Sequence, residues 1–195
     1  MARQATVTKD KLLGATATTL AKWGLRKTTL DDIGKAAGVS KAAVLYHFHS
    51  KEELVAAVID AEHQRFLATL RESVGKETTA EGRLRTFALL RFRYITDRLR
   101  DYGDVAKEII ESVMPLVRAS EARYREDELS LLRTMLAEGM ATGELAPGDP
   151  DLIAMAAMAA LAGLYEGFML YDRSDKIAEG IEQLFHLLMN GLRRR

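Results

Sequence analysis

The apolar positions of this chain recur mostly three and four residues apart, which is the spacing of one face of an α-helix. In the first such segment Leu12 and Leu20 share a stripe with Thr16 and Thr19, and Gly24 follows directly after the segment. Runs that alternate apolar and polar residues between turn residues, the pattern of a β-strand, are nearly absent. We therefore predict an all-α protein of about nine helices.

Turn and capping residues set the limits of these helices. Thr29 and Asp32 form a capping pair that begins a short second helix, and Gly38 ends it. Ser40 caps a third helix, and the segment Ser50-Lys51-Glu52-Glu53 is a capping box for a long fourth helix. The predicted helices cover residues 7–23, 30–37, 41–47, 51–74, 81–101, 104–117, 119–141, 149–171 and 174–192.

The last two predicted helices carry more apolar surface than one chain can cover. One stripe dominates the final helix, and the helix before it is apolar on nearly every side. Paired with the same helices of a second copy across a two-fold axis, they would form a four-helix bundle, although a core within one chain is the alternative. The predicted residues of this homodimer interface are Leu161, Leu164, Phe168, Ile177, Ile181, Leu184, Phe185 and Leu188.

The longest apolar run, residues 152–171, is long enough to suggest a membrane span. It is rich in Ala and Gly and contains Glu166, so we interpret it as a buried helix. The first residues of the chain lack the apolar core of a signal peptide. We expect a cytoplasmic protein that does not enter the membrane.

Charge is distributed unevenly although the formal net charge is zero. Residues 1–50 contain eight Lys and Arg against three Asp, an excess of +5 that the remaining residues balance. A basic head joined to an acidic body is typical of a nucleic-acid-binding module with an attached second domain. The chain has no Cys, which excludes disulfides, Cys-ligated zinc and Cys nucleophiles.

The second and third predicted helices form a helix-turn-helix pattern. Ala36 and Ala37 allow the two helices to cross closely, and Gly38 permits the positive φ angle of the turn. Val39 fills the angle between the helices, and Ser40 caps the second of them. The pattern indicates a DNA-binding head.

The stretch 11–58 resembles the DNA-binding domain of the tetracycline-repressor (TetR) family. The motifs G-x-x-x-T-T, D-I-x-x-A-A-G-V-S, Y-H-F and S-K-E-E-L occur in order within it. The resemblance implies a ligand-responsive, dimeric bacterial repressor that binds a palindromic double-stranded DNA operator. Residues 1–50 would form the DNA-binding domain, and residues 51–195 the effector-binding and dimerisation domain.

The resemblance also implies which residues meet DNA. Thr29 would bond a phosphate through its hydroxyl and N–H, and Lys51 would add a charged phosphate contact. The start of the recognition helix, residues 41–47, would face base edges, and its end would touch phosphates. Leu45 stands where the family often has Tyr and can pack on a thymine methyl group. The full predicted set is Thr28, Thr29, Ser40, Lys41, Ala42, Ala43, Leu45, Tyr46, His47 and Lys51.

Aromatic and Met side chains of the body are candidates to line an effector cavity. Most side chains of these types simply pack in a core, but Met suits adaptable apolar sites, and Glu166 could supply a polar group. We expect a small, mostly apolar effector that moves the fourth helix and so releases the operator. The candidates are Phe66, Phe87, Tyr94, Tyr102, Met114, Met135, Met158, Tyr165, Glu166 and Met169.

The sequence offers no support for catalysis. It contains neither the nucleophile motif G-x-S-x-G nor the phosphate-binding motifs rich in glycine, and its four His residues lack zinc-site spacing. We therefore expect no metal, no cofactor and no enzyme activity. An activator, a regulator that needs a corepressor, and a small-molecule-binding protein without DNA activity remain as alternatives.

Overall fold

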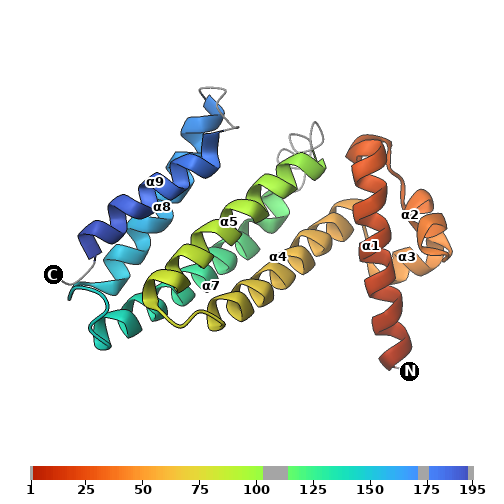
Figure 1. The fold of residues 1–195 in the computed structure, drawn as a ribbon. Coiled ribbons are helices and arrows are strands. Elements are labelled where there is room, and N and C mark those ends of the chain that lie inside the picture. Colours follow the sequence, from red (N-terminus) through yellow and green to blue (C-terminus); the bar gives the residue numbers. More distant parts are fainter. Residues whose placement is uncertain (1, 103–113, 171–175, 193–195) are drawn as a thin grey trace. The chain divides into compact units, whose positions relative to one another are not determined.

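The computed structural model describes residues 2–102, 114–170 and 176–192, with side chains for 9–97, 122–163, 176 and 178–192. In that part of the chain the backbone forms eight helices and no β-strand, which confirms the all-α prediction. The helices are α1 (Ala2–Lys27), α2 (Leu30–Ala37), α3 (Lys41–His47), α4 (Lys51–Gly75), α5 (Ala80–Tyr102), α7 (Met114–Ala141), α8 (Pro150–Leu170) and α9 (Ile177–Leu192) (Figure 1).

Most predicted boundaries agree with these helices to within a few residues. The predicted end at Gly24 is confirmed as the end of regular helix, because Gly24 has the non-helical angles φ 78° and ψ 167°, and the residues of α1 up to Lys27 form a separate turn after this break. The turn beyond the break is held by Leu25, which is buried, and by the Thr28 N–H, which donates to the Gly24 carbonyl at 3.2 Å. Most of the helix predicted at 104–117 lies outside the described residues, and residues from 114 onward belong to α7.

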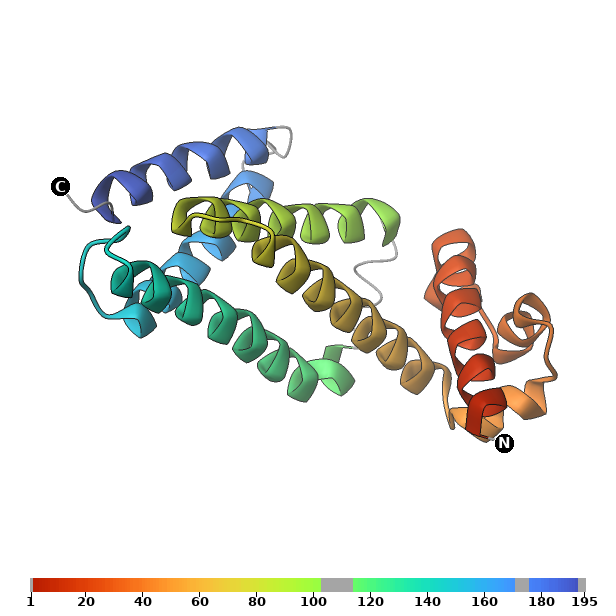
Figure 2. The ribbon, with the colours of Figure 1, turned by 60° about the horizontal axis from the view of Figure 1, so that its bottom comes forward.

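The chain divides into two compact units, Met1–Arg65 with Thr96–Arg123 and Phe66–Ile95 with Tyr124–Arg195. In the first unit α1 packs on α2, and α2 packs on α3 (Figure 2). Packing units need not coincide with functional domains, so the boundary expected at residue 50 remains a functional prediction. The core of the first unit consists of Leu12, Leu13, Ile33, Val44, Phe48, Leu54 and Val58.

Three helix N-termini in the first unit are capped by side chains. The capping box of Thr29 and Asp32 is present in both directions, and the Ala43 N–H donates to the Ser40 hydroxyl at 3.1 Å. The box predicted at residues 50–53 forms only by half. The Glu53 N–H donates to Ser50 Oγ, but the Glu53 carboxylate accepts from the N–H of His49 at 2.8 Å instead of that of Ser50.

The turn between α2 and α3 depends on two glycines. Gly38 has φ 70° and ends α2, as predicted, and the next N–H, of Val39, donates back to the Gly34 carbonyl at 2.9 Å. A Cβ atom on Gly34 would lie 2.9 Å from the Val39 carbonyl oxygen, which belongs to the backbone of the turn. The sequence interpretation assigned the close crossing to Ala36 and Ala37, but Ala36 is exposed, and the position that admits no side chain is Gly34.

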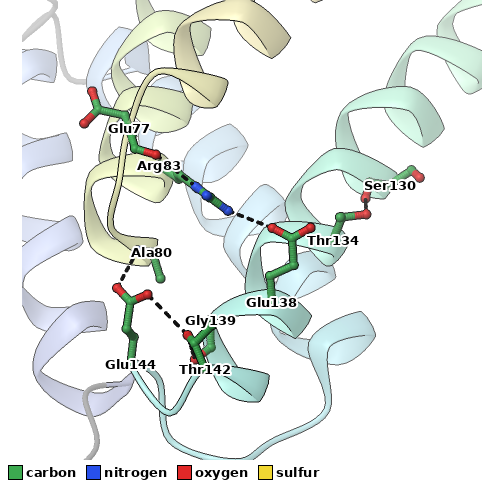
Figure 3. A network of polar contacts seen from close by, with 9 residues as sticks. All are labelled: Glu77, Ala80, Arg83, Ser130, Thr134, Glu138, Gly139, Thr142 and Glu144. Atoms are coloured by element: carbon green, nitrogen blue, oxygen red, sulfur yellow. Dashed lines mark hydrogen bonds and ion pairs between the residues drawn. The ribbon is translucent and has the colours of Figure 1, made fainter.

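The second unit contains a larger core, to which the end of α4 and helices α5, α7, α8 and α9 contribute. Near one end of α7, the Glu144 carboxylate caps α5 by accepting from the Ala80 N–H at 2.8 Å and also accepts from Thr142 Oγ1 at 3.2 Å (Figure 3). Arg83 of α5 pairs with Glu138 of α7 at 2.7 Å in the same network. These contacts fasten the start of α5 to the end of α7.

An ion pair is buried between α5 and α7. Arg91 Nε lies 2.7 Å from Glu128 Oε2, and the two side chains are only 15% and 9% exposed. Burial raises the pKa of Glu128 above its ordinary value, and the charge and hydrogen bond of Arg91 oppose that rise. The cost of removing the two charges from water is thus offset by their attraction to each other. Loss of either partner leaves the other charge mostly buried and without a counter-charge.

Replacement of Gly34 by Ala should destabilise the first unit. The added methyl group meets a backbone carbonyl, so the turn must shift, at a cost of about 1–2 kcal/mol. Gly14→Ala in α1 is the control, because a Cβ there meets nothing within 4 Å and should stabilise the helix by about 0.5–1 kcal/mol. Chemical denaturation followed by circular dichroism measures both, and equal effects would contradict the steric account.

Replacement of Arg91 by Met should cost about 3 kcal/mol at neutral pH, because Glu128 then ionises without a partner. The pKa of Glu128 in the folded variant then rises further above the ordinary 4.5. The folded state therefore keeps the Glu128 proton at pH values at which the unfolded state has lost it, and the stability of the variant falls as the pH increases above 4.5. The deficit should shrink as the pH is lowered toward the ordinary pKa of 4.5. Arg85→Met, which breaks an exposed pair with Glu182, is the control. Its free energy of unfolding, measured by denaturation, should fall by less than about 1 kcal/mol, and this decrease should depend little on pH.

Candidate functional site

The outward face of α3 is the centre of the candidate site. Val44 is completely buried and Phe48 is 3% exposed, so these two side chains anchor the helix to the core of the first unit. On the opposite face Tyr46 is 83% exposed and Leu45 is 41% exposed, and Lys41 and Ala42 are exposed beside them. Ala43 and His47 are half-buried, and the His47 ring meets the edge of Tyr46 with centroids 5.2 Å apart.

The dimensions of α3 fit a DNA groove. Its seven residues span about 10 Å, and an α-helix with its side chains is about 10–12 Å wide, close to the roughly 12 Å width of the major groove. The short side chains of Ala42 and Ala43 allow the first turn to approach the base edges. The predicted contact face therefore coincides with the exposed face of this helix.

The N-terminus of α2 presents Thr29 at the surface, but its donors are already engaged. The N–H and hydroxyl of Thr29 donate to Asp32 Oδ2 at 3.0 and 2.6 Å. These bonds hold the pKa of the Asp32 carboxyl below its ordinary value. A phosphate at this position must displace the carboxylate, so the contact of Thr29 with DNA remains a prediction.

Thr28, also predicted to contact DNA, does not reach the surface. Its side chain is 1% exposed, and its hydroxyl donates to the Gly24 carbonyl at 2.6 Å. The hydroxyl thus closes the last turn of α1 after the break at Gly24. We remove Thr28 from the proposed contacts.

The ammonium group of Lys51, predicted to contact a phosphate, is already engaged by backbone carbonyls, so this contact remains a prediction. Its ammonium group donates to the carbonyls of Leu25 at 2.6 Å and Thr28 at 3.1 Å and is half-buried. A cation that binds the carbonyls at a helix C-terminus satisfies groups that have no partner within the helix. Lys51 therefore fastens the start of α4 to the end of α1, a contact across 26 residues that no local sequence pattern signals.

Comparison with known proteins identifies the family. The model of the family described as "Bacterial regulatory proteins, tetR family" matches residues 12–58. The transcriptional repressor KstR2 of Mycolicibacterium smegmatis is 30% identical over 149 residues, which cover 74% of this chain and 71% of the relative. The chain belongs to the TetR family.

Two further similarities span most of the chain. The transcriptional regulator TtgR of Pseudomonas putida is 27% identical over 187 residues, covering 92% of this chain and 89% of that protein. A solved transcriptional regulator from Cytophaga hutchinsonii has the same fold, with a TM-score of 0.82, 19% identity and coverage of 94% and 97% of the two chains. As a TetR-family member the protein is a helix-turn-helix transcriptional regulator.

Five of the effector residues predicted for this TetR-family member have described side chains, and all five lie in or against one core cluster of the second unit. Phe66 stacks on Tyr94 with ring centroids 4.1 Å apart, and both belong to the core of the second unit with Met135 and Met158. Phe87 is 1% exposed and lines a cavity of about 490 Å³ in the same unit. The side chains of Tyr102, Met114, Tyr165, Glu166 and Met169 lie outside those that the structure describes.

Residues predicted for the dimer interface line this cavity instead. Helices α5, α7, α8 and α9 form its walls, and its 18 described lining residues are all Ala, Gly, Ile, Leu, Met or Phe. The side chains of Leu164, Phe168 and Ile177 lie outside the described set. The predicted interface residues among the lining are Leu161, Ile181, Leu184, Phe185 and Leu188.

Among the side chains that the structure places, three or more His, Asp or Glu are nowhere grouped as a metal site requires. Likewise, none of the described helices combines the length and hydropathy needed to span a membrane.

The roles of Lys41 and Lys51 predict different salt dependences of operator binding. Lys41→Met removes a proposed DNA contact, so the slope of log affinity against log salt should fall by about 1. Lys51→Met should leave that slope unchanged, because its ammonium binds carbonyls, while it destabilises the first unit by about 1–2 kcal/mol. Fluorescence anisotropy at several salt concentrations measures the slopes, and a reduced slope for Lys51→Met would confirm its phosphate contact.

Proposed function

We propose that the protein is a homodimeric repressor that a small, mostly apolar effector releases from a palindromic operator. The exposed face of α3, with Tyr46 at 83% exposure opposite a fully buried Val44, is the observation that carries this proposal. Two such helices in a dimer would read successive major grooves about 34–36 Å apart. A regulator of this kind acts in the cytoplasm, where the bacterial chromosome lies.

An apolar face on α8 and α9 supports the dimer. Along α8 the exposed apolar residues recur at intervals of three and four, so they share one side of the helix. Exposed apolar patches that a single chain leaves open commonly mark association surfaces, and two helices from each copy would complete a four-helix bundle. The exposed apolar positions are Leu152, Met155, Ala156, Ala159, Ala162 and Gly163 on α8 and Leu187 with Leu188 on α9, and of these the sequence interpretation named only Leu188.

The apolar cavity supports the effector part of the proposal. An effector can change operator affinity only by its preference for one of two states of the protein, and such coupling is typically worth about 1–3 kcal/mol. Residues 1–50 would carry the DNA contacts and residues 51–195 the effector and the dimer interface.

Operator binding is tested with duplex DNA from upstream of the protein's own gene, by anisotropy at low salt. We expect specific binding that Lys41→Ala weakens about 5- to 100-fold, the range for the loss of one base contact, and that Tyr46→Ala weakens through the loss of a phosphate contact. Lys76→Ala, which removes an exposed Lys from the second unit, is the matched control and should change affinity less than twofold. Sedimentation equilibrium should give the mass of two chains.

Two results would contradict the proposal. If no upstream fragment binds specifically, the alternative without DNA activity takes its place. If the chain sediments as a monomer both free and on DNA, the apolar face of α8 and α9 has another role.

A further inference from the structure

We propose that the cavity between α5, α7, α8 and α9 binds an uncharged hydrocarbon, either a whole molecule or the part of one that bears no hydrogen-bonding group. This inference rests on the proposed function in one respect, namely that the bound molecule is the effector. Phe87, Leu136 and Met189, each at most 2% exposed, are among the residues that line the cavity deep in the second unit.

The chemistry of the lining sets the class of ligand. Among the 18 described residues around the cavity, none has a charged side chain, a hydroxyl or an amide. The N–H and C=O groups of helical backbone bond one another within the helix except in its first and last turns, and at the end of α9 the Leu192 carbonyl accepts from the Ala146 N–H at 2.6 Å. A polar ligand group placed here would lose its hydrogen bonds to water without replacement, at a cost of about 2–7 kcal/mol, and a charged group would lose more.

The size of the cavity suits a small molecule. Its volume of about 490 Å³ falls within the usual range of ligand pockets, about 300–1,000 Å³. An apolar cavity of about 150 Å³ in another protein stays free of water and takes up benzene. The cavity here is about three times larger, so it has room for several fused rings or a folded alkyl chain.

The mouth of the cavity is continuous with the proposed dimer face. Leu187 is 70% exposed and Leu188 is 38% exposed, and both line the cavity at its rim together with the exposed Ala156 of α8. A second copy packed on α8 and α9 would lie across this rim, whereas Phe87, Leu136 and Met189 in the lining are already buried in one chain. The second copy therefore covers the entrance, and the hydrocarbon occupies the space below it.

Pyrene, a fluorescent hydrocarbon, and its anionic relative 1-pyrenesulfonate form a matched pair of probes. We expect one pyrene per chain, with the change in vibronic band ratio that marks an apolar environment, and at least 10-fold weaker binding of the sulfonate. Ala160→Phe fills the cavity from α8 and should weaken pyrene binding at least 10-fold. Leu184→Trp in α9 fills it from the opposite wall, which keeps the test decisive if one variant folds poorly.

Ala137→Phe is the control for these variants, because Ala137 is an exposed residue of α7 outside the described lining and the same side chain is added. Unchanged pyrene binding in both filled variants would overturn the assignment of the cavity. Equal affinity for pyrene and its sulfonate would overturn the ligand class. If substitution of Met155 or Ala159 on the proposed dimer face abolishes pyrene binding, the probe lies between two copies of the chain, and this result would also overturn the assignment of the cavity.

The same titrations separate this inference from the proposed function. If pyrene binds as expected but leaves operator affinity unchanged, the cavity stands as a hydrocarbon site and its role as the effector site fails. If no operator binds the protein at all, the repressor proposal fails, while the pyrene titration still decides the chemistry of the cavity.

Discussion

Burial of Val44 against the core of the first unit is the interaction on which the DNA-binding head depends. An isolated helix of seven residues is not stable in water, because nucleation costs more than so few hydrogen bonds return. Val44 and Phe48 supply the apolar contact that holds α3 in place, and the absent side chain of Gly34 lets the turn before it approach α2. The same anchoring leaves Tyr46 and Lys41 on the outer face, so one packing constraint both forms the helix and presents its proposed contacts.

The sequence was most informative about interactions that span four residues or fewer. The capping pair of Thr29 and Asp32 and the cap of Ser40 follow from residue types at fixed spacing, and the structure contains both. The bond from Lys51 to Leu25 joins residues far apart in the chain, so its direction depends on how α1 and α4 pack. A lysine at the start of a helix looks the same in sequence whether it faces a phosphate or a carbonyl, so the sequence alone could not predict the carbonyl contacts of Lys51.

The faces of the body helices were harder to predict for a related reason. Periodicity finds an amphipathic helix, but α8 is apolar on nearly every side, so its pattern cannot tell the core face from the open one. Ala154 is fully buried while Met155, its neighbour and the larger apolar residue, is 58% exposed. The effector residues were chosen by type, and aromatic pairs such as Phe66 with Tyr94 are as useful to a solid core as to a cavity wall.

The contrast between the two units limits how the regulator can work under the proposed function. The DNA-binding face offers cations and hydrogen-bond donors, whose direction gives specificity. The cavity offers only apolar contact, which is non-directional and grows with the area removed from water. Shape alone can then select the hydrocarbon, so molecules of similar outline should bind with similar affinity. The coupling to DNA is only the difference between the affinities of the hydrocarbon for the two states of the protein. A ligand that fits one arrangement of α5, α7, α8 and α9 better than the other therefore changes operator affinity more than a ligand that binds both arrangements tightly.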